Sequence, residues 1–311
     1  MISKKSKITV IGAGKIAYSL VYALKNAGYN VKTIISRNLK SAKSLAEKFS
    51  IKNYSNNLND FNSQAKIFFL SVPDNQIKIT ADKLANLNSN FNDLLFIHLS
   101  GAEDVFKLNS LKKKGAITAS FHIMQTFPSK RIVNIKNCYA AVETNNTYAE
   151  NYLFKLSADI KLKPFKLKSE NKTRYHLAGV FTSNFLVGNF FNSKKVFDIK
   201  KINKKYNNFD FLLPIIKSTL NNIDKLGSSK SLSGPIERGD NTTIKKHIST
   251  LKKIKGNSEK INDIYLNYIV QSISLLNVVS SKQKKLSKEH LELKKYLVKE
   301  FKILCEHFWK D

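Results

Sequence analysis

Two glycines and an alanine near the start of the chain have the types and spacing of a phosphate-binding turn. Gly12, Gly14 and Ala17 follow the apolar run 8–11 and open a helical pattern over 16–26. In a Gly-x-Gly-x-x-Ala turn the first glycine makes a tight turn and the second lets the backbone approach a pyrophosphate. The small third residue allows close packing of helix on strand, and the phosphates bind free N–H groups at the helix N-terminus. We expect this turn to bind a dinucleotide rather than to be only structural, through Gly12, Ala13, Gly14, Lys15 and Ile16.

The residues after the second apolar run, 31–35, bear on which dinucleotide binds. A domain that prefers NAD has an acidic residue here to accept a hydrogen bond from the ribose 2′-hydroxyl, whereas this chain has Ser36 and Arg37. A serine and an arginine can bind a 2′-phosphate that a carboxylate would repel. We therefore expect NADP, with NAD less favoured. The alternative is an exposed arginine at the end of a strand.

Six further candidate residues follow later apolar runs, each near the end of a predicted strand. They are Val72, Pro73, Ser100, Gly101, His122 and Gln125. Ligands of open α/β sheets bind beyond the carboxyl ends of the strands. We expect the first four of these residues at the cofactor, with the Val-Pro pair either against the nicotinamide or forming a simple turn. We expect the glutamine to position the substrate.

Two histidines are candidates for moving a proton. His122 follows a predicted strand, and His176 lies in the segment 172–191, which is apolar nearly all round and therefore predicts a buried helix. Histidine titrates near neutral pH, and hydride transfer needs a group that gives or takes a proton. The alternatives are a backbone-orienting hydrogen bond for His122 and a satisfied core histidine for His176.

Two polar residues share the helix face of His176, namely Ser183 and Asn184. Polar groups in so apolar a helix must find partners, which would be a substrate, the nicotinamide or another helix. We expect Asn184 to hold a substrate carbonyl or hydroxyl and Ser183 to contact the substrate.

The segment 231–242 has more glycine, proline and charge than a connector needs. Within it, Arg238 could pair with a carboxylate or phosphate of the substrate. Asp240 or Asn241 could cap the helix that follows, and Asp74 could likewise cap a helix over 75–87.

The elements that must position these residues fall into two groups. Apolar runs predict strands at 8–11, 31–35, 66–72, 94–99, 116–121 and 139–142, and we expect two further short strands near 52–54 and at 164–167. They alternate with helical patterns at 16–26, 39–49, 75–87 and 147–159, which predicts an α/β domain with a mostly parallel sheet. After residue 168 only helical patterns follow, at 172–191, 209–226, 242–253, 261–279 and 287–308, with a loose connection at 193–207. We expect a cofactor-binding domain over 1–145, a transition over 146–168 and an all-helical domain over 169–311.

The composition excludes several classes of function. The formal charge is +30, but only four of the 53 basic residues are arginine, the residue that base readers favour. Lysines are scattered throughout, so we expect a solvated basic surface and no nucleic-acid partner. Two distant cysteines without metal-ligand spacing indicate a reducing compartment and no metal site. No apolar run approaches the about 20 residues that span a bilayer, so we expect a cytoplasmic protein without a membrane partner.

Six motifs along the chain together resemble those of a known family. The motifs are residues 8–17, 72–74, 98–102, 121–127, 175–176 with 183–184, and 233–240. This set resembles bacterial proteins with a Rossmann-like domain followed by a DUF2520 domain, except that Ile123 stands where that family usually has proline. The family is similar to pyrroline-5-carboxylate reductase, the F420-dependent NADP reductases and the 6-phosphogluconate dehydrogenase group. The resemblance implies an NADP-binding domain and a 6-phosphogluconate-dehydrogenase-like helical domain that commonly forms a homodimer.

Two functions remain open from the sequence. The first is an NADP-dependent oxidoreductase that moves hydride to or from a small carbonyl, imine or alcohol bound between the domains. The second is a protein that binds NADP or a metabolite as a sensor without turnover. Neither the residues nor the resemblance identifies a substrate.

Overall fold

The computed structural model of the chain describes residues 2–61, 64–87, 90–253 and 263–308. The chain divides into two compact units, Met1–Phe185 and Leu186–Asp311. No helix among the described residues is long and apolar enough to cross a membrane.

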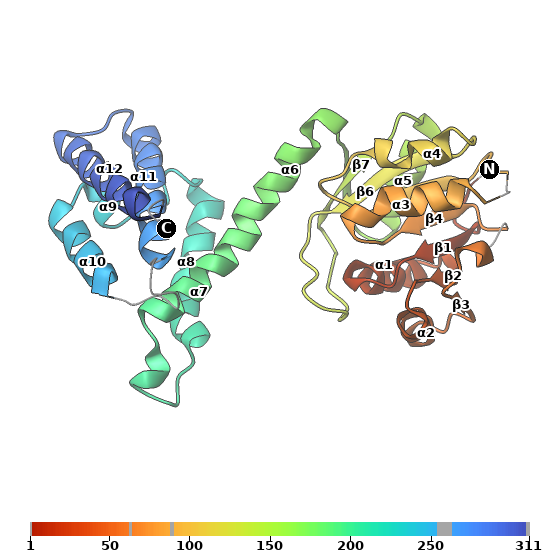
Figure 1. The fold of residues 1–311 in the computed structure, drawn as a ribbon, viewed down its shortest axis with the longest axis horizontal. Coiled ribbons are helices and arrows are strands. Elements are labelled where there is room, and N and C mark those ends of the chain that lie inside the picture. Colours follow the sequence, from red (N-terminus) through yellow and green to blue (C-terminus); the bar gives the residue numbers. More distant parts are fainter. Residues whose placement is uncertain (1, 62–63, 88–89, 254–262, 309–311) are drawn as a thin grey trace. The chain divides into compact units, whose positions relative to one another are not determined.

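The first unit is built on one eight-stranded sheet (Figure 1). The strands are β1 (Lys7–Ile11), β2 (Asn30–Ile35), β3 (Asn53–Ser55), β4 (Ile67–Leu70), β5 (Leu95–His98), β6 (Ile117–Ile123), β7 (Tyr139–Glu143) and β8 (Lys163–Lys166). Their order is β3-β2-β1-β4-β5-β6-β7-β8, and every neighbouring pair is parallel except β6 and β7. The prediction of a mostly parallel sheet is confirmed. The carboxyl ends of β1, β4, β5 and β6 therefore meet at one edge.

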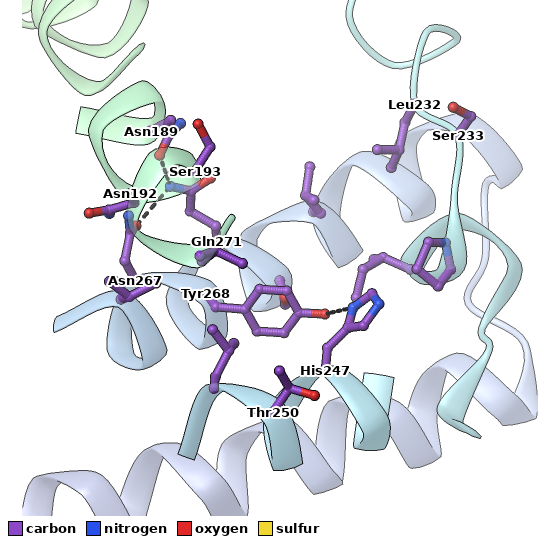
Figure 2. A pocket seen from close by; sticks show the side chains of 17 residues that line it. Asn189, Asn192, Ser193, Leu232, Ser233, His247, Thr250, Asn267, Tyr268 and Gln271 are labelled. Atoms are coloured by element: carbon purple, nitrogen blue, oxygen red, sulfur yellow. Dashed lines mark hydrogen bonds between the residues drawn. The ribbon is translucent and has the colours of Figure 1, made fainter. Parts of the chain in front are cut away.

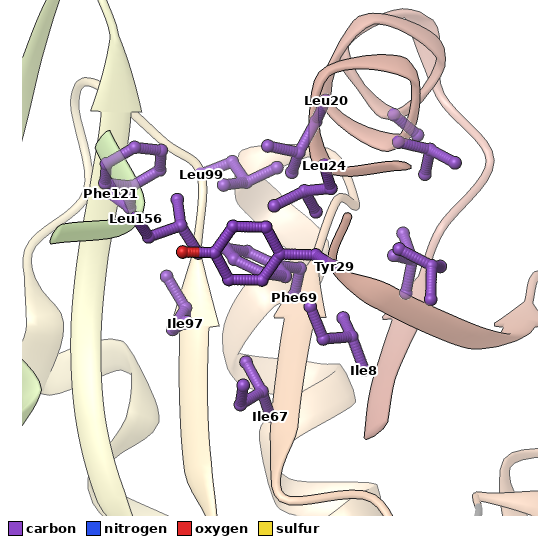
Figure 3. Close-up of a cluster of buried hydrophobic side chains, with 14 of the residues drawn as sticks. Ile8, Leu20, Leu24, Tyr29, Ile67, Phe69, Ile97, Leu99, Phe121 and Leu156 are labelled. Carbon is purple, nitrogen blue, oxygen red and sulfur yellow. The ribbon is translucent and has the colours of Figure 1, made fainter. Parts of the chain in front are cut away.

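Helices cover both faces of this sheet. They are α1 (Lys15–Asn26), α2 (Leu39–Lys48), α3 (Asp74–Ala85), α4 (Asn109–Lys112) and α5 (Thr147–Asp159), followed by α6 (Lys172–Gly179). Side chains alternate between the faces of a strand, so Ile67 and Phe69 of β4 face one layer while Phe68 faces the other. Figure 3 shows the first layer, in which Leu20 of α1 and Leu156 of α5 pack over the sheet.

The second unit is helical. Its helices are α7 (Phe185–Val196), α8 (Asn208–Leu226), α9 (Pro235–Arg238), α10 (Asn241–Lys253), α11 (Asp263–Gln283) and α12 (Lys288–Phe308). Its buried core comes from α9 to α12, with Ile244, Ile269 and Leu297 fully buried. The expected fold, an α/β domain followed by a helical one, is confirmed.

The prediction of a buried helix over 172–191 is wrong for this chain. Helix α6 is followed by a π-helical segment, η4 (Val180–Asn184), and only then by α7. The π turn inserts an extra residue, so the regular face expected to join His176 to Asn184 is interrupted. Phe181 and Val187 are 61% and 67% exposed. Apolar composition alone therefore did not show whether these side chains are buried.

Two smaller expectations also fail. Asp74 does not cap α3, because Pro73 is the cap residue and Asp74 is the first helical residue, where its charge favours the helix N-terminus. The stretch 193–207 is not entirely loose, since α7 runs to Val196 and a 3₁₀ turn, η5, covers Ile199–Lys201.

Candidate functional site

The turn after β1 has the geometry that its glycines predict. Gly12 has φ +106°, and a Cβ there would lie 2.1 Å from the Ser71 carbonyl oxygen at the end of β4. A Cβ on Gly14 would lie 3.5 Å from the same oxygen, which is an ordinary contact. Gly12 is therefore required by the fold, whereas Gly14 leaves free space above the turn.

The N-terminus of α1 is open to an anion. Gly14 is its cap residue, and no side chain among the described residues caps the helix. The first turn has no acidic residue and begins with the exposed Lys15. Free N–H groups and the helix dipole at such a terminus favour a phosphate.

A cavity of about 220 Å³ lies beside this turn. Seven of the predicted cofactor residues line it, namely Gly12, Ala13, Gly14, Ser36, Arg37, Val72 and Pro73. Ser71 lines it too, and its buried hydroxyl has no hydrogen-bond partner among the described residues. A tight turn that requires glycine at Gly12, together with the hydroxyl of Ser71, which is unpartnered among the described residues, fits the phosphates of a dinucleotide.

Arg37, just after β2, also lines this cavity. Its Nη1 donates a hydrogen bond to Gln76 Oε1 at 3.3 Å, and no carboxylate of the described residues pairs with it. Its neighbour Ser36 lines the same cavity. The guanidinium is therefore available to an anion.

Ser100 and Gly101 shape the turn after β5 and do not line the cavity. The Ser100 hydroxyl accepts hydrogen bonds from the N–H groups of Ala102 (3.1 Å) and Glu103 (3.0 Å). A Cβ on Gly101 would lie 2.7 Å from Nε2 of His122, so the imidazole packs directly on this glycine. The turn after β5 thereby fixes the position of the histidine at the end of β6.

His122 forms a close pair with Tyr175 of α6. Its Nδ1 lies 2.9 Å from the Tyr175 hydroxyl oxygen, and the two rings are nearly perpendicular. The ring of His176 lies 6.4 Å from that of His122, centroid to centroid. Lys172, Tyr175 and His176 are spaced i, i+3 and i+4, so one face of α6 meets the sheet. The two predicted histidines are thus brought together, with a tyrosine between β6 and α6 that the sequence analysis gave no role.

A buried ion pair fixes the start of α6. Lys172 Nζ lies 2.8 Å from Glu143 Oε2 and also donates to the Ser120 hydroxyl. The other oxygen of Glu143 accepts from the Val105 N–H (3.1 Å) and from the Ser169 hydroxyl (2.6 Å). The side chains of the pair are 3% and 5% exposed. This cluster joins β6, β7, the loop after β5 and α6.

Burial keeps two histidines uncharged. Desolvation, then the charges of Lys172 and His176, lowers the pKa of His122 to about 4. Desolvation, then the charge of Lys172, lowers the pKa of the fully buried His98 to about 3. Desolvation also raises the pKa of Tyr175, so this phenol stays protonated. At neutral pH the site offers a neutral imidazole hydrogen-bonded to a neutral phenol.

These lowered pKa values predict acid sensitivity of the fold. The unfolded chain, with histidine pKa values near 6.5, binds more protons than the folded chain between about pH 6.5 and 4. The stability from the neutral imidazoles is therefore complete above pH 6.5 and is lost as the pH falls. Urea unfolding should show a free energy that falls by up to about 1.4 kcal/mol per pH unit for each histidine. His122→Gln should remove the part of this pH dependence that His122 contributes. An unchanged pH dependence of the unfolding free energy in that variant would contradict the lowered pKa of His122.

The remaining predicted residues each have local surroundings of their own. Gln125 Oε1 accepts the Thr126 N–H at 2.8 Å within its own loop. Ser183 is half-buried and Asn184 exposed in the π-helical segment. Arg238 ends α9 in the helical unit, where neighbouring Asp240 caps α10, as expected, by accepting the Thr243 N–H at 2.9 Å.

Lys172, Glu143 and Tyr175 have no function predicted from the sequence. A signal was present for two of them, because the spacing Lys-x-x-Tyr-His places them on the helix face of His176. No group of three His, Cys, Asp or Glu side chains that could hold a metal ion gathers among the described residues.

Comparison with known families and structures agrees with the expected resemblance. A family model described as coenzyme F420-dependent NADP oxidoreductase matches residues 7–99, and one described as the domain of unknown function DUF2520 matches residues 138–270. No curated protein matches the chain.

Three solved structures illustrate the likeness. A Bacteroides fragilis protein assigned as an NADP oxidoreductase is 25% identical, with 91% of this chain and 99% of that one covered and a TM-score of 0.71. A Thermotoga maritima protein is 26% identical, with coverage of 89% and 100% and a TM-score of 0.62. A reductive aminase from Aspergillus terreus, in complex with NADPH, shares the fold at 12% identity, with coverage of 95% and 93% and a TM-score of 0.57.

Proposed function

We propose that this chain, with its NADP oxidoreductase and DUF2520 family matches, is an NADP-dependent oxidoreductase acting on a small carbonyl, imine or alcohol. The observation that carries the proposal is the glycine cradle of Gly12 and Gly14 beneath an uncapped helix, with Arg37 lining the same cavity. When bound, NADPH would supply the hydride for reduction, and NADP+ would take it in the reverse direction. The chain's own residues must then hold the cofactor and handle the proton.

Tyr175 and His122 are suited to handle that proton. The Tyr175 hydroxyl is protonated at neutral pH, so it can donate to an oxygen or nitrogen on which negative charge develops. Burial raises its pKa and so weakens it as an acid, which makes a partner that stabilises the phenolate necessary. In the tautomer with Nδ1 protonated, His122 donates to the phenolic oxygen at 2.9 Å and stabilises the phenolate that forms. His176, whose ring lies 6.4 Å from that of His122, is the residue that we expect to orient the substrate.

The proposal is tested by NADPH oxidation against a panel of ketones, aldehydes, cyclic imines and keto acids, followed by loss of NADPH fluorescence. Turnover of any class by the purified chain supports an enzyme. NADPH binding with no turnover across the panel would favour a sensor, which shares the cofactor site but does not need the tyrosine.

Tyr175→Phe should lower kcat about a hundredfold with little change in KM, because only the proton donor is removed. The matched variant is Tyr139→Phe, since Tyr139 is 56% exposed on β7. Steady-state kinetics on both variants decide the assignment. Equal kcat values in the two would remove Tyr175 from the mechanism.

Arg37→Ala should weaken NADPH about tenfold or more and leave NADH nearly unchanged, because only NADPH has a 2′-phosphate for the guanidinium to pair with. Titration of each nucleotide, followed by fluorescence anisotropy, measures this ratio. An equal loss for both nucleotides would refute the 2′-phosphate role. Arg131→Ala, which alters an exposed arginine outside the cavity, is the control.

The exposed apolar side chains of α7 and α8 suggest a homodimer. Val187 and Phe191 of α7, with Phe209 and Ile215 of α8, are each more than half exposed. So much exposed apolar surface on neighbouring segments is typical of a protein interface. Sedimentation should give the mass of two 35.4 kDa chains, and Ile215→Lys should shift it towards one.

A further inference from the structure

A second cavity, in the helical unit, shares no lining residue with the proposed cofactor site. It has a volume of about 580 Å³ and lies among α7, α10, α11 and the loop before α9 (Figure 2). All its lining residues belong to the unit Leu186–Asp311. Its size is that of typical small-molecule sites, which are mostly about 300–1,000 Å³.

The lining of this cavity has no Lys, Arg, Asp or Glu among the described residues. In a chain with 24% charged residues, about four of the 17 lining residues would be charged by composition alone. The walls are instead apolar, with Leu232, Ile236, Leu251 and Ile264 among them. The cavity is open to solvent at Asn189, His247 and Gln271, and a charged ligand would gain no ionic partner from the described lining residues, so the lining favours an uncharged one.

Amide side chains gather at one end of the cavity. Gln271 Nε2 donates to Asn189 Oδ1 at 2.5 Å and to Asn267 Oδ1 at 2.7 Å, as Figure 2 shows. Both N–H groups of Gln271 are thereby used. Its Oε1 and the Nδ2 groups of the two asparagines have no partner among the described residues. This end presents an acceptor beside two donors, which is the complement of an amide.

A second pair of polar side chains, His247 and Tyr268, also lines the cavity. His247 Nδ1 is 2.9 Å from the Tyr268 hydroxyl, and the two rings meet edge to face with centroids 5.8 Å apart. Figure 2 shows this exposed pair among the lining residues, away from the amide cluster. The histidine's Nε2 is left to give or take one more hydrogen bond.

We propose that this cavity is a separate binding site for an uncharged small molecule with an apolar body and an amide-like group. Its carbonyl would accept from the asparagine Nδ2 groups, its N–H would donate to Gln271 Oε1, and its apolar part would contact Ile236 and Ile264. Such a site needs neither the glycine turn nor NADPH, so the proposal goes beyond the proposed function and can fail without it.

The test uses the full chain with ¹³C-labelled isoleucine methyl groups and N-benzylacetamide as the probe. Phenylacetate and benzylammonium, of similar size but charged, are the counter-probes. The methyl signals of Ile236 and Ile264 should shift with the neutral probe at millimolar concentration, while Ile8 of the sheet should not. Neither charged compound should shift them.

Asn267→Leu should weaken the neutral probe about tenfold by removing one hydrogen-bonding amide. Asn277→Leu is the matched control, because Asn277 is exposed on the same helix outside the cavity. Thermal unfolding of both variants separates lost binding from lost folding. The proposal is overturned if the charged probes shift the same signals, if no probe binds, or if a folded Asn267→Leu chain binds as well as the control.

Discussion

Gly14→Val is expected to abolish measurable NADPH binding, with a loss of about a thousandfold or about 4 kcal/mol, while the chain stays folded. The backbone of Gly14 is extended, with φ −78° and ψ −177°, a conformation that valine adopts readily. A Cβ there meets only an ordinary contact at 3.5 Å. Its methyl groups would instead occupy the space that the pyrophosphate needs above the helix N-terminus.

A substitution of Gly12 is the comparison for Gly14→Val, because it should affect both binding and folding. Gly12→Ala places a Cβ 2.1 Å from the Ser71 carbonyl oxygen at a positive φ, so it should lose NADPH affinity and also more than about 2 kcal/mol of stability. Anisotropy titrations and thermal unfolding of both variants separate the two effects. NADPH affinity retained in folded Gly14→Val would show that the phosphates bind elsewhere.

Lys172→Met is expected to lower the free energy of unfolding by about 3–5 kcal/mol. The substitution keeps the length of the side chain but leaves Glu143 buried without its cation. Two hydrogen bonds, from the Val105 N–H and the Ser169 hydroxyl, still reach that carboxylate, but they cannot neutralise it. Urea unfolding at neutral pH measures the loss.

Two further variants test the cause of that loss. Lys168→Met, at an exposed lysine near the start of α6, should change the unfolding free energy by no more than about 0.5 kcal/mol. Adding Glu143→Gln to Lys172→Met should recover part of the stability, because the unpaired charge is gone. A Lys172 variant as stable as the Lys168 variant would contradict a structural ion pair.

The sheet and the cofactor turn were predictable because their signals are local. Continuous apolar runs such as 67–70 mark strands covered on both faces, and Gly12 and Gly14 have spacing that few other structures need. Ligands of open α/β sheets bind beyond the carboxyl ends of the strands, and this predicted that Val72 and Pro73 lie at the same cavity as the glycine turn.

The buried ion pair was not predictable, because nothing local distinguishes Lys172 from the many exposed lysines of this chain. Its burial follows from α6 meeting β6 and β7, a contact between distant segments. The exposure of α7 was missed for a related reason, since apolar periodicity does not say which chain covers a surface. The histidine pair was predicted as candidate residues, but the tyrosine that contacts it needed the three-dimensional arrangement.

The most direct test of the account is a titration of the full chain into NADPH at neutral pH, followed by the anisotropy of the nicotinamide fluorescence, with NADH in parallel. We expect saturable binding of one NADPH per chain and at least about tenfold weaker binding of NADH. Unchanged anisotropy for both nucleotides at chain concentrations of about 100 μM would contradict it, because the glycine turn would then hold no dinucleotide.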